Sequence, residues 1–512
     1  MDCTMSKKCH LKLLMIFFSF QSLFSAEKPN IIVILADDLG YADVGFHEIH
    51  EKDINTPNMD KLAASGVTFT NAYASSPICS ASRLGFSTGR YQERWGAYWY
   101  GQGGLVKDEQ TIAEYLLGEG YTTMKVGKTH LNGGQKQDPL SHGFENWLGF
   151  IHHSHDFHML SSKDVEAYEK RKRGGSKHNQ SPIGPLSRNN TLESFENTTT
   201  TEVFARESVN FIKAKKNKPF YLQLEFNAVH TVMIRPPNKE LAEKYGIPMR
   251  HFDRNAKEWE FPNYDPVKEK NFKSWYSKVA HKGEIDPYGR KLYLAYLEEM
   301  DSAIGRIMTA LQETDQVENT LIFFSSDNGG SHQSYANNGK LNVYKYCLLD
   351  GGIKVPMLIS WPNRIKKNGK VDALVTHRDF FPTICSVIGA KSKKSLDGKS
   401  LLPAIDGKVH GVHDGPLYWD IGKSWVIRDG KWKVIQHENL EYSTYKTDEN
   451  GLVVEIPPIT VVGGTKLFDM ESDPGETQDL SVQYPEKMAE MQKRYTEWRS
   501  QMPNPKKSYK KR

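Results

Sequence analysis

The feature that most constrains this chain is an unbroken apolar run at residues 31–36, within the segment KPNIIVILADDLG. An apolar run without polar alternation is typical of a strand that is buried on both faces. Strands of that kind belong to sheets that helices cover on both sides. Two acidic residues follow the run directly, so this strand should deliver polar groups at its carboxyl end.

Helical patterns alternate with apolar strands over hundreds of residues. A helical pattern at 111–120 precedes a strand at 121–128, a second at 200–216 precedes 219–226, and a third at 291–313 precedes 319–326. Such alternation is typical of α/β folds with parallel strands. We therefore expect a large, mainly parallel but mixed sheet sandwiched by helices.

Two further segments depart from this pattern. Residues 161–197 are polar, rich in Lys, Ser and Asn, and without periodicity, so they are expected to form an inserted surface loop or lid. After residue 405, short alternating segments (417–422, 424–430 and 431–436) and a final helical pattern at 485–500 indicate a small antiparallel sheet with one helix. The sequence thus predicts a large domain at 27–405 and a smaller α+β domain at 406–512, which ends in a basic tail.

The first 26 residues have the layout of a secretory signal peptide. Three lysines precede an apolar stretch at 13–24, and small residues end the segment at Ser25 and Ala26. The alternative is an N-terminal core helix. No later segment is long and apolar enough to predict a membrane span. We expect export to a periplasm or secretion.

Charge and cysteine content narrow the function further. The formal net charge is +5, and the signal and the basic tail carry positive charge in excess of that, so the body offers no general nucleic-acid-binding surface.

Cys3 and Cys9 leave with the signal, and Cys79, Cys347 and Cys385 remain. An odd number of cysteines in an exported protein cannot all be paired, which marks one thiol for other chemistry. Cys79 is the candidate.

Oxygen-bearing side chains follow two of the predicted strands. Asp37 and Asp38 follow the first strand, and Asp327 and Asn328 follow the strand at 319–326. Ligands of α/β sheets bind beyond the carboxyl ends of the strands. Hard cations such as Ca²⁺ or Mg²⁺ take such oxygen ligands, whereas Zn²⁺ favours histidine or thiolate. The alternative is that these acids only cap turns and helices.

Cationic and titratable side chains are predicted at the same edge of the sheet. Lys128 and His130 follow one strand and His230 follows another, while Lys345 lies after the segment SSDNGG. A metal ion with lysines and an arginine, facing two histidines, is what binding and cleaving a tetrahedral oxyanion ester requires. Any one of these residues alone is more often a surface group.

The segment CSASR, residues 79–83, resembles the Cys-x-Pro/Ala-x-Arg signature of the type I sulfatases, the formylglycine-dependent sulfatases of the alkaline phosphatase superfamily. Ala81 takes the place of the usual proline. In that family a formylglycine-generating enzyme oxidises the cysteine to 3-oxoalanine (Cα-formylglycine). The resemblance implies that Cys79 does not stay a thiol.

Other motifs carry the same resemblance in family order from residue 30 to residue 480. They are PNIIVILADDLGYADVG, GKTHL, SSDNGG, the segment NGKLNVYKYCLLDGGIKVPMLISWP, and LFDMESDPGETQDLS. Three residues depart from the family pattern: Thr129 stands where the family has tryptophan, and Asp350 and Lys354 replace glutamate and arginine.

The resemblance implies a role for each matching residue. One Ca²⁺ would be bound by Asp37, Asp38, Asp327 and Asn328 together with the modified Cys79. Arg83 would orient the formylglycine with the aid of Lys128, and His130 would hydrogen-bond its diol. Lys128, Lys345 and His230 would bind the sulfate, with His230 donating a proton to the leaving alcohol. Ser154, in the histidine-rich run at 152–158, is similar to a serine that some members use on the sulfate.

The implied function is a sulfuric ester hydrolase that uses a formylglycine-hydrate nucleophile and Ca²⁺. One hydroxyl of the hydrate attacks sulfur, and the second, once deprotonated, re-forms the aldehyde and expels sulfate. The aromatic segment at 95–100 and the histidine run suggest walls for sugar rings, although Trp95, Tyr98, Trp99 and Tyr100 could equally belong to ordinary packing. We expect a sulfated carbohydrate as substrate, either an algal polysaccharide or a glycosaminoglycan oligosaccharide.

Two other functions fit the sequence less well. A phosphonate or phosphodiester hydrolase of the same superfamily can share the formylglycine and metal motifs. A non-catalytic binder of sulfated glycans would keep an unmodified Cys79, but every polar catalytic position is intact in this chain.

Overall fold

The computed structural model describes residues 28–506 except 51, 132–136, 160–184, 216–217, 232, 234 and 250–285. The predicted signal peptide, residues 161–184 of the polar insert and the last six residues of the basic tail lie outside the described residues. None of the described helices is both long enough and apolar enough to cross a membrane.

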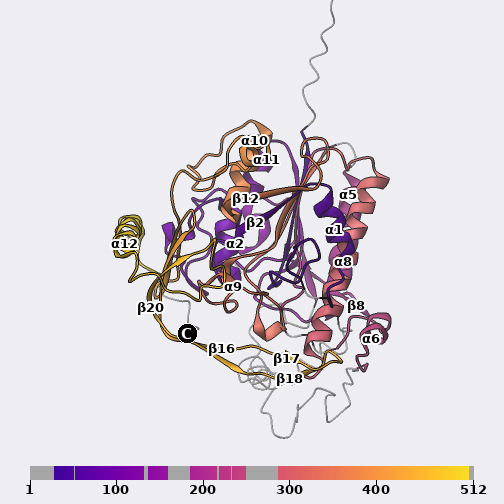
Figure 1. The fold of residues 1–512 in the computed structure, drawn as a ribbon. Helices are drawn as coiled ribbons and strands as arrows, with labels where there is room; N and C mark the ends of the chain where they lie inside the picture. The colour runs from indigo at the N-terminus through magenta and orange to yellow at the C-terminus, as the bar shows by residue number, and fades with distance from the viewer. Residues whose placement is uncertain are drawn as a thin grey trace, which may run out of the picture.

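A ten-stranded mixed sheet forms the centre of the fold (Figure 1), in the order β12-β2-β11-β10-β1-β9-β3-β4-β6-β7. Its strands are β1 (Asn30–Ala36), β2 (Val67–Tyr73), β3 (Thr122–Lys128), β4 (Asn146–Phe150), β6 (Leu186–Arg188), β7 (Thr191–Glu193), β9 (Phe220–Glu225), β10 (Thr320–Ser326), β11 (Met357–Ser360) and β12 (Gly369–Thr376). The central strands β10, β1, β9, β3 and β4 are parallel, while β11, β6 and β7 pair antiparallel to their neighbours. The expected α/β fold class is confirmed.

Strand β1 is buried on both faces, as its apolar run predicts. Ile32 and Ile34 pack in one hydrophobic core, and Ile31 and Val33 pack in another on the opposite face. The first core is closed by the helices α1 (Pro57–Ala64), α5 (Thr200–Ala214), α6 (Lys239–Tyr245) and α8 (Gly289–Glu313). The second is closed by α2 (Cys79–Thr88), α3 (Ile112–Gly118), α10 (Phe380–Ile388) and α11 (Leu402–Ile405). Figure 1 shows these two groups on opposite sides of the sheet.

The polar insert is not a loop along its whole described length. Residues 186–193 form the hairpin β6–β7, which extends the sheet beyond β4. Leu186 is fully buried in the first core, Phe195 packs against the same core, and β6 pairs with β4, so these contacts hold a polar segment at the sheet edge. The expectation of a loop is wrong for these residues. A short pair, β5 (His158–Met159) with β8 (Thr198–Thr199), lies on either side of the insert.

The C-terminal part holds the predicted antiparallel sheet, in the order β13-β14-β15-β20. Its strands are β13 (Leu417–Asp420), β14 (Trp425–Asp429), β15 (Trp432–His437) and β20 (Gly464–Asp469), and α12 (Pro485–Ser500) packs on it. Two small pairs complete this part, β16 (Leu440–Ser443) with β19 (Pro458–Val461) and β17 (Lys446–Thr447) with β18 (Val453–Glu455).

A buried ionic network joins the small sheet to the large one. Lys433 Nζ lies 2.7 Å from Asp350 Oδ1 and 2.6 Å from Glu476 Oε1. Asp350 begins the short helix α9 (Asp350–Ile353), and the hydroxyl of Tyr73, on β2, donates to Asp350 Oδ2 at 2.7 Å. Arg428, on β14, donates to the same hydroxyl. Burial opposes ionisation, but Lys433 and Arg428 outweigh it and lower the pKa of Asp350 to about 2.

The central strands approach one another closely at Gly127, and this gives a test of the fold. A Cβ at Gly127 would lie 1.9 Å from the carbonyl oxygen of Glu225, and the residue has φ of 101°. We expect Gly127→Ala to reduce the free energy of unfolding by at least about 2 kcal/mol, through overpacking and backbone strain. Urea denaturation measures the change.

The matched control is Gly118→Ala, in α3, where a Cβ would meet nothing within 4 Å. This change should leave stability unaltered or raise it by about 0.5–1 kcal/mol. Equal stability of the two variants would contradict the packing described for β3.

Candidate active site

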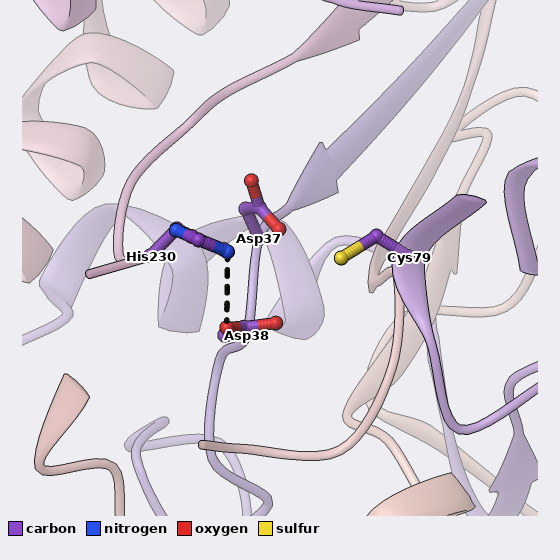
Figure 2. Close-up of side chains that lie close together, drawn as sticks. All are labelled: Asp37, Asp38, Cys79 and His230. Carbon is purple, nitrogen blue, oxygen red and sulfur yellow. Dashed lines mark ion pairs between the residues drawn. The ribbon is translucent and has the colours of Figure 1, made fainter. Parts of the chain in front are cut away.

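The carboxyl ends of the central strands bring the predicted acids together. Strands β1 and β10 are parallel neighbours with Ala36 opposite Ser326, so the residues that follow, Asp37 and Asp327, lie side by side. All four predicted oxygen ligands are almost completely buried. In Figure 2 the side chains of Asp37, Asp38, Cys79 and His230 converge on a common point.

Helix α2 places Cys79 and Arg83 on this edge. Cys79 is the first residue of the ten-residue helix, and Arg83 follows four residues later, on the same helical face. Both side chains are buried. The spacing of the CSASR motif is therefore the spacing of one helical turn, with the cysteine at the positive end of the helix dipole.

Arg83 binds three carboxylates that come from three strands. Its Nε and Nη2 donate to Asp327 Oδ2 at 3.0 and 2.7 Å, Nη2 lies 3.7 Å from Asp37 Oδ1, and Nη1 pairs with Glu225. Burial disfavours the charge on Asp327, but Arg83 and Lys128 outweigh burial and lower the pKa of this carboxyl to about 2.

Two lysines supply the remaining positive charge. Lys128 pairs with Asp37, and Lys345 Nζ lies 2.6 Å from Asp38 Oδ1 and donates to Cys79 Sγ at 2.9 Å. Burial nevertheless raises the pKa of Asp37 to about 8, against the effect of Lys128. A further positive charge would therefore stabilise this site, because its own cations do not fully stabilise the clustered carboxylates.

Three buried oxygens in this cluster have no hydrogen-bond partner among the described residues: Asp37 Oδ1, Asp38 Oδ2 and Asn328 Oδ1. The amide nitrogen of Asn328 is satisfied, because it donates to Asp38 Oδ1 at 2.7 Å. Potential metal-binding atoms of Asp37, Asp38, Cys79 and His230 lie within 4.8 Å of one another. Unpartnered buried oxygens are costly, so this donor set fits an oxygen-preferring cation.

The Cys79 thiol is not activated as a nucleophile. Burial raises its pKa to about 11, although Lys128 and Lys345 act in the opposite direction. Reactive cysteines have pKa values well below that of a free thiol. Burial therefore favours the protonated form of the Cys79 thiol.

Both predicted histidines lie at the site. The Nδ1–H of His230 donates to the carbonyl of Thr231 at 2.5 Å, which leaves Nε2 to face Asp38 Oδ2 at 3.7 Å (Figure 2). Neither ring nitrogen of His130 has a hydrogen-bond partner within the described chain. Burial and Lys128 lower the pKa of both histidines well below the usual value. Both rings are therefore neutral at neutral pH in this structure.

Ser154 is not tied to the cluster in the same way. It is half-buried in the loop after β4, and its carbonyl accepts a hydrogen bond from His152 Nδ1 at 2.6 Å. For the part of the chain that is described, no hydrogen bond joins its hydroxyl to Cys79 or to the residues around it. The ring of its neighbour His153 lies 6.2 Å from that of His130.

Some aromatic residues of the segment at 95–100 belong to the hydrophobic packing, and others lie close to site residues. Trp95 and Tyr98 are buried in hydrophobic clusters and serve packing. Tyr100 is about half exposed, and its ring lies 5.8 Å from that of His130. Trp99, half-buried, lies 6.1 Å from the ring of Tyr346, the residue after Lys345.

Glu225 and Lys125 belong to the site but are missing from the sequence prediction. Lys125 Nζ lies 2.5 Å from Glu225 Oε1, whose other oxygen holds Arg83. Burial lowers the pKa of Lys125 to about 8, while Glu225 acts to raise it. The sequence does contain a signal for this pair. Both residues lie inside strands predicted to be buried, and a charged residue is rarely buried without a partner of opposite charge.

Fold and site together define a hydrolase of the α/β class, with a buried, cation-rich site for an oxyanion at the carboxyl edge of a mainly parallel sheet. The Sulfatase family model matches residues 29–390, and the model described as N-sulphoglucosamine sulphohydrolase, C-terminal, matches residues 342–501. The chain belongs to the sulfatase family and is a sulfuric ester hydrolase.

Known relatives span nearly the same length. The chain is 27% identical over 487 residues to N-acetylgalactosamine-6-sulfatase of Canis lupus familiaris, covering 89% of this chain and 82% of the relative. It is 28% identical over 485 residues to arylsulfatase A of Bos taurus, covering 90% and 84%. The solved structure of Ps i-CgsB in complex with k-i-k-neocarrahexaose is similar with a TM-score of 0.73 and 30% identity, over 94% of each chain.

The contact between Glu225 and Arg83 can be tested by Glu225→Gln. The amide keeps the shape of the side chain but removes the charge that holds Arg83 Nη1. We expect sulfate release to fall by about 10–100-fold, as for other residues that orient groups of an active site. The fold should persist, because Lys125 can lose its proton when its partner is neutral.

Glu202→Gln is the matched control. Glu202 pairs with Arg306 at 2.7 Å on the surface, where an ion pair contributes little. Activity of Glu225→Gln equal to that of this control would show that Arg83 needs no support from Glu225.

Proposed function

We propose that this protein is an exported, Ca²⁺-dependent carbohydrate sulfatase whose Cys79 is converted to formylglycine. The observation that carries the proposal is the set of three buried cations, Arg83, Lys128 and Lys345, gathered around Cys79 beside carboxylates that keep unpartnered oxygens. A site of this kind suits a tetrahedral oxyanion together with a hard cation.

The donor set supports calcium. Asp37, Asp38, Asp327 and Asn328 offer hard oxygen atoms, and the modified Cys79 would offer another. When bound there, the ion would stabilise charge on the sulfate oxygens and lower the pKa of a hydroxyl group that it binds.

The chemistry of Cys79 supports its modification. A thiol with a pKa of about 11 is a poor nucleophile at neutral pH, yet the surrounding charges converge on it. A formylglycine-generating enzyme is the maturation partner that this proposal requires. The signal-like residues 1–26 support export to a periplasm or beyond.

The other residues have roles that follow from their contacts. Lys345, between Asp38 and Cys79, is placed to neutralise a sulfate oxygen, and Lys128 does the same from the side of Asp37. The Nε2 atom of His230 faces the site and carries no proton in the neutral ring, so it would have to take up a proton before donating one to the leaving alcohol. Arg83 fixes the helix that carries residue 79 against the acids. Ser154 stays a prediction as a sulfate ligand.

A sulfated carbohydrate is the substrate class that the surroundings favour. Tyr100 and His153 form an aromatic wall beside His130, and aromatic faces suit sugar rings. The solved structure of Ps i-CgsB, 30% identical to this chain, is a complex with a carbohydrate. We propose an algal polysaccharide or a glycosaminoglycan oligosaccharide as the source of that sugar.

Mass spectrometry across Cys79, on native protein or on protein made together with a formylglycine-generating enzyme, tests the proposal. We expect loss of one sulfur and two hydrogens with gain of one oxygen, followed by sulfate release from sulfated oligosaccharides. Faster turnover of phosphodiesters or phosphonates would favour the rival hydrolase. A persistent thiol with glycan binding and no sulfate release would favour a non-catalytic binder.

Calcium binding is tested by thermal denaturation, which needs no substrate. A ligand that binds only the folded state stabilises it by about 2.7 kcal/mol at one hundred times its Kd. Ca²⁺ should raise the melting temperature of protein treated with a chelator, and Asp38→Asn should remove most of that rise. An exposed control, Asp315→Asn in the turn before β10, should keep it. No rise with Ca²⁺ in the parent protein would refute the metal assignment.

A further inference from the structure

A pocket of about 290 Å³ lies beside the loop that carries Lys345. It is formed by the loop after the 3-10 helix at Gln92–Trp95, by the segment after Lys345, by the ends of β13 and β15 in the C-terminal sheet, and by the separate strand β16. The lining residues that matter are Trp99, Tyr346, Lys423, His437, Asn439 and Tyr442. Its volume lies just below the usual range for small-molecule sites, about 300–1,000 Å³.

Tyr346 connects this pocket to the catalytic cluster. Lys345 contacts Cys79 and Asp38, and the ring of the next residue, Tyr346, lies 5.4 Å from Lys345 Nζ and lines the pocket. The backbone of Tyr346 is left-handed, with φ of 77°, and its N–H donates to the carbonyl of Pro77 at 2.9 Å. A bulky residue takes this conformation only where its surroundings impose it. This turn directs the side chain of Lys345 toward Cys79 and the ring of Tyr346 toward the pocket.

The pocket is lined by aromatic rings and by a buried histidine. The rings of Trp99 and Tyr346 lie 6.1 Å apart at a tilt of 52°. His437, at the end of β15, is only 2% exposed, and its Nδ1–H donates to the carbonyl of Glu438 at 2.8 Å. Its Nε2 therefore accepts hydrogen bonds in the neutral ring, and it has no partner among the described residues. Burial lowers the pKa of this histidine, which favours the neutral form.

We propose that this pocket binds the sugar ring adjacent to the sulfated one in an oligosaccharide substrate. The inference rests on the proposed carbohydrate sulfatase function and names residues that determine its specificity. Trp99 and Tyr346 provide faces for the C–H groups of a pyranose, and His437 Nε2 accepts a hydrogen bond from one of its hydroxyls.

The charge of the pocket indicates which kind of ring it takes. Lys423, at its rim, is paired with Glu438 at 3.0 Å, and the lining also includes Glu441. The positive charge of the rim is thus balanced by neighbouring carboxylates, and Lys423 is largely exposed, whereas the cations around Cys79 are buried. A ring recognised through hydroxyls and C–H faces fits here, and a second sulfate group does not.

The test compares two substrate lengths. His437→Leu removes the unpartnered acceptor while keeping a buried apolar side chain, and Trp99→Leu removes the aromatic face. We expect each variant to lose at least tenfold in kcat/KM on a sulfated oligosaccharide, mainly through KM, and to keep its kcat/KM on the corresponding sulfated monosaccharide. The matched control is His410→Leu, an exposed histidine outside the pocket, which should change neither value.

Each outcome decides between the proposals. Equal losses on both substrates, or no loss, would overturn the subsite and leave the sulfatase proposal intact. If the parent protein hydrolyses no sulfated glycan, the proposed function fails, and calorimetric titration with the same oligosaccharide then decides the subsite separately. Binding that is lost in His437→Leu would support the pocket, and binding equal to that of the parent protein would overturn it.

Discussion

The ion pairs of Arg83 are the interactions on which the rest of the site depends. Three carboxylates, Asp37, Glu225 and Asp327, arrive from three neighbouring parallel strands and are fully buried at one edge of the sheet. Buried carboxylates without a cation are very costly. A single guanidinium with five donors hydrogen-bonds Asp327 and Glu225 and lies 3.7 Å from Asp37, a set of contacts that one lysine could not make. Arg83 is also the residue that ties helix α2, and therefore Cys79, to the sheet.

The site is consequently formed by the fold as a whole. Its charged groups come from segments between residues 37 and 345, and the chain comes back to the same edge for each of them. Groups fixed by different strands and by a helix need little rearrangement when an anion binds, which is the condition for strong electrostatic stabilisation. Burial, together with the like charges of Asp327 and Asp38, raises the pKa of Asp37 to about 8 against the effect of Lys128, and this is why the site suits a cation.

The sequence predicted the central strands and the groups at their ends because both signals are local. An apolar run without alternation identifies β1, and the residues directly after it must lie at the sheet edge. Glu225 and Lys125 could not be assigned in the same way, because their partnership depends on which strands become neighbours. The hairpin β6–β7 depends on pairing with β4 and on one buried leucine, which a polar composition conceals. The roles of Trp99 and Trp95 also differ only through tertiary contacts.

The network around Asp350 makes the two parts of the chain depend on each other. Lys433 and Glu476 of the C-terminal part meet Asp350 and Tyr73 of the large sheet at a junction closed to solvent. Separating the two parts would therefore leave buried charges without their partners on both sides of the junction. The C-terminal part depends on this contact with the large sheet for the pairing of its own buried charges.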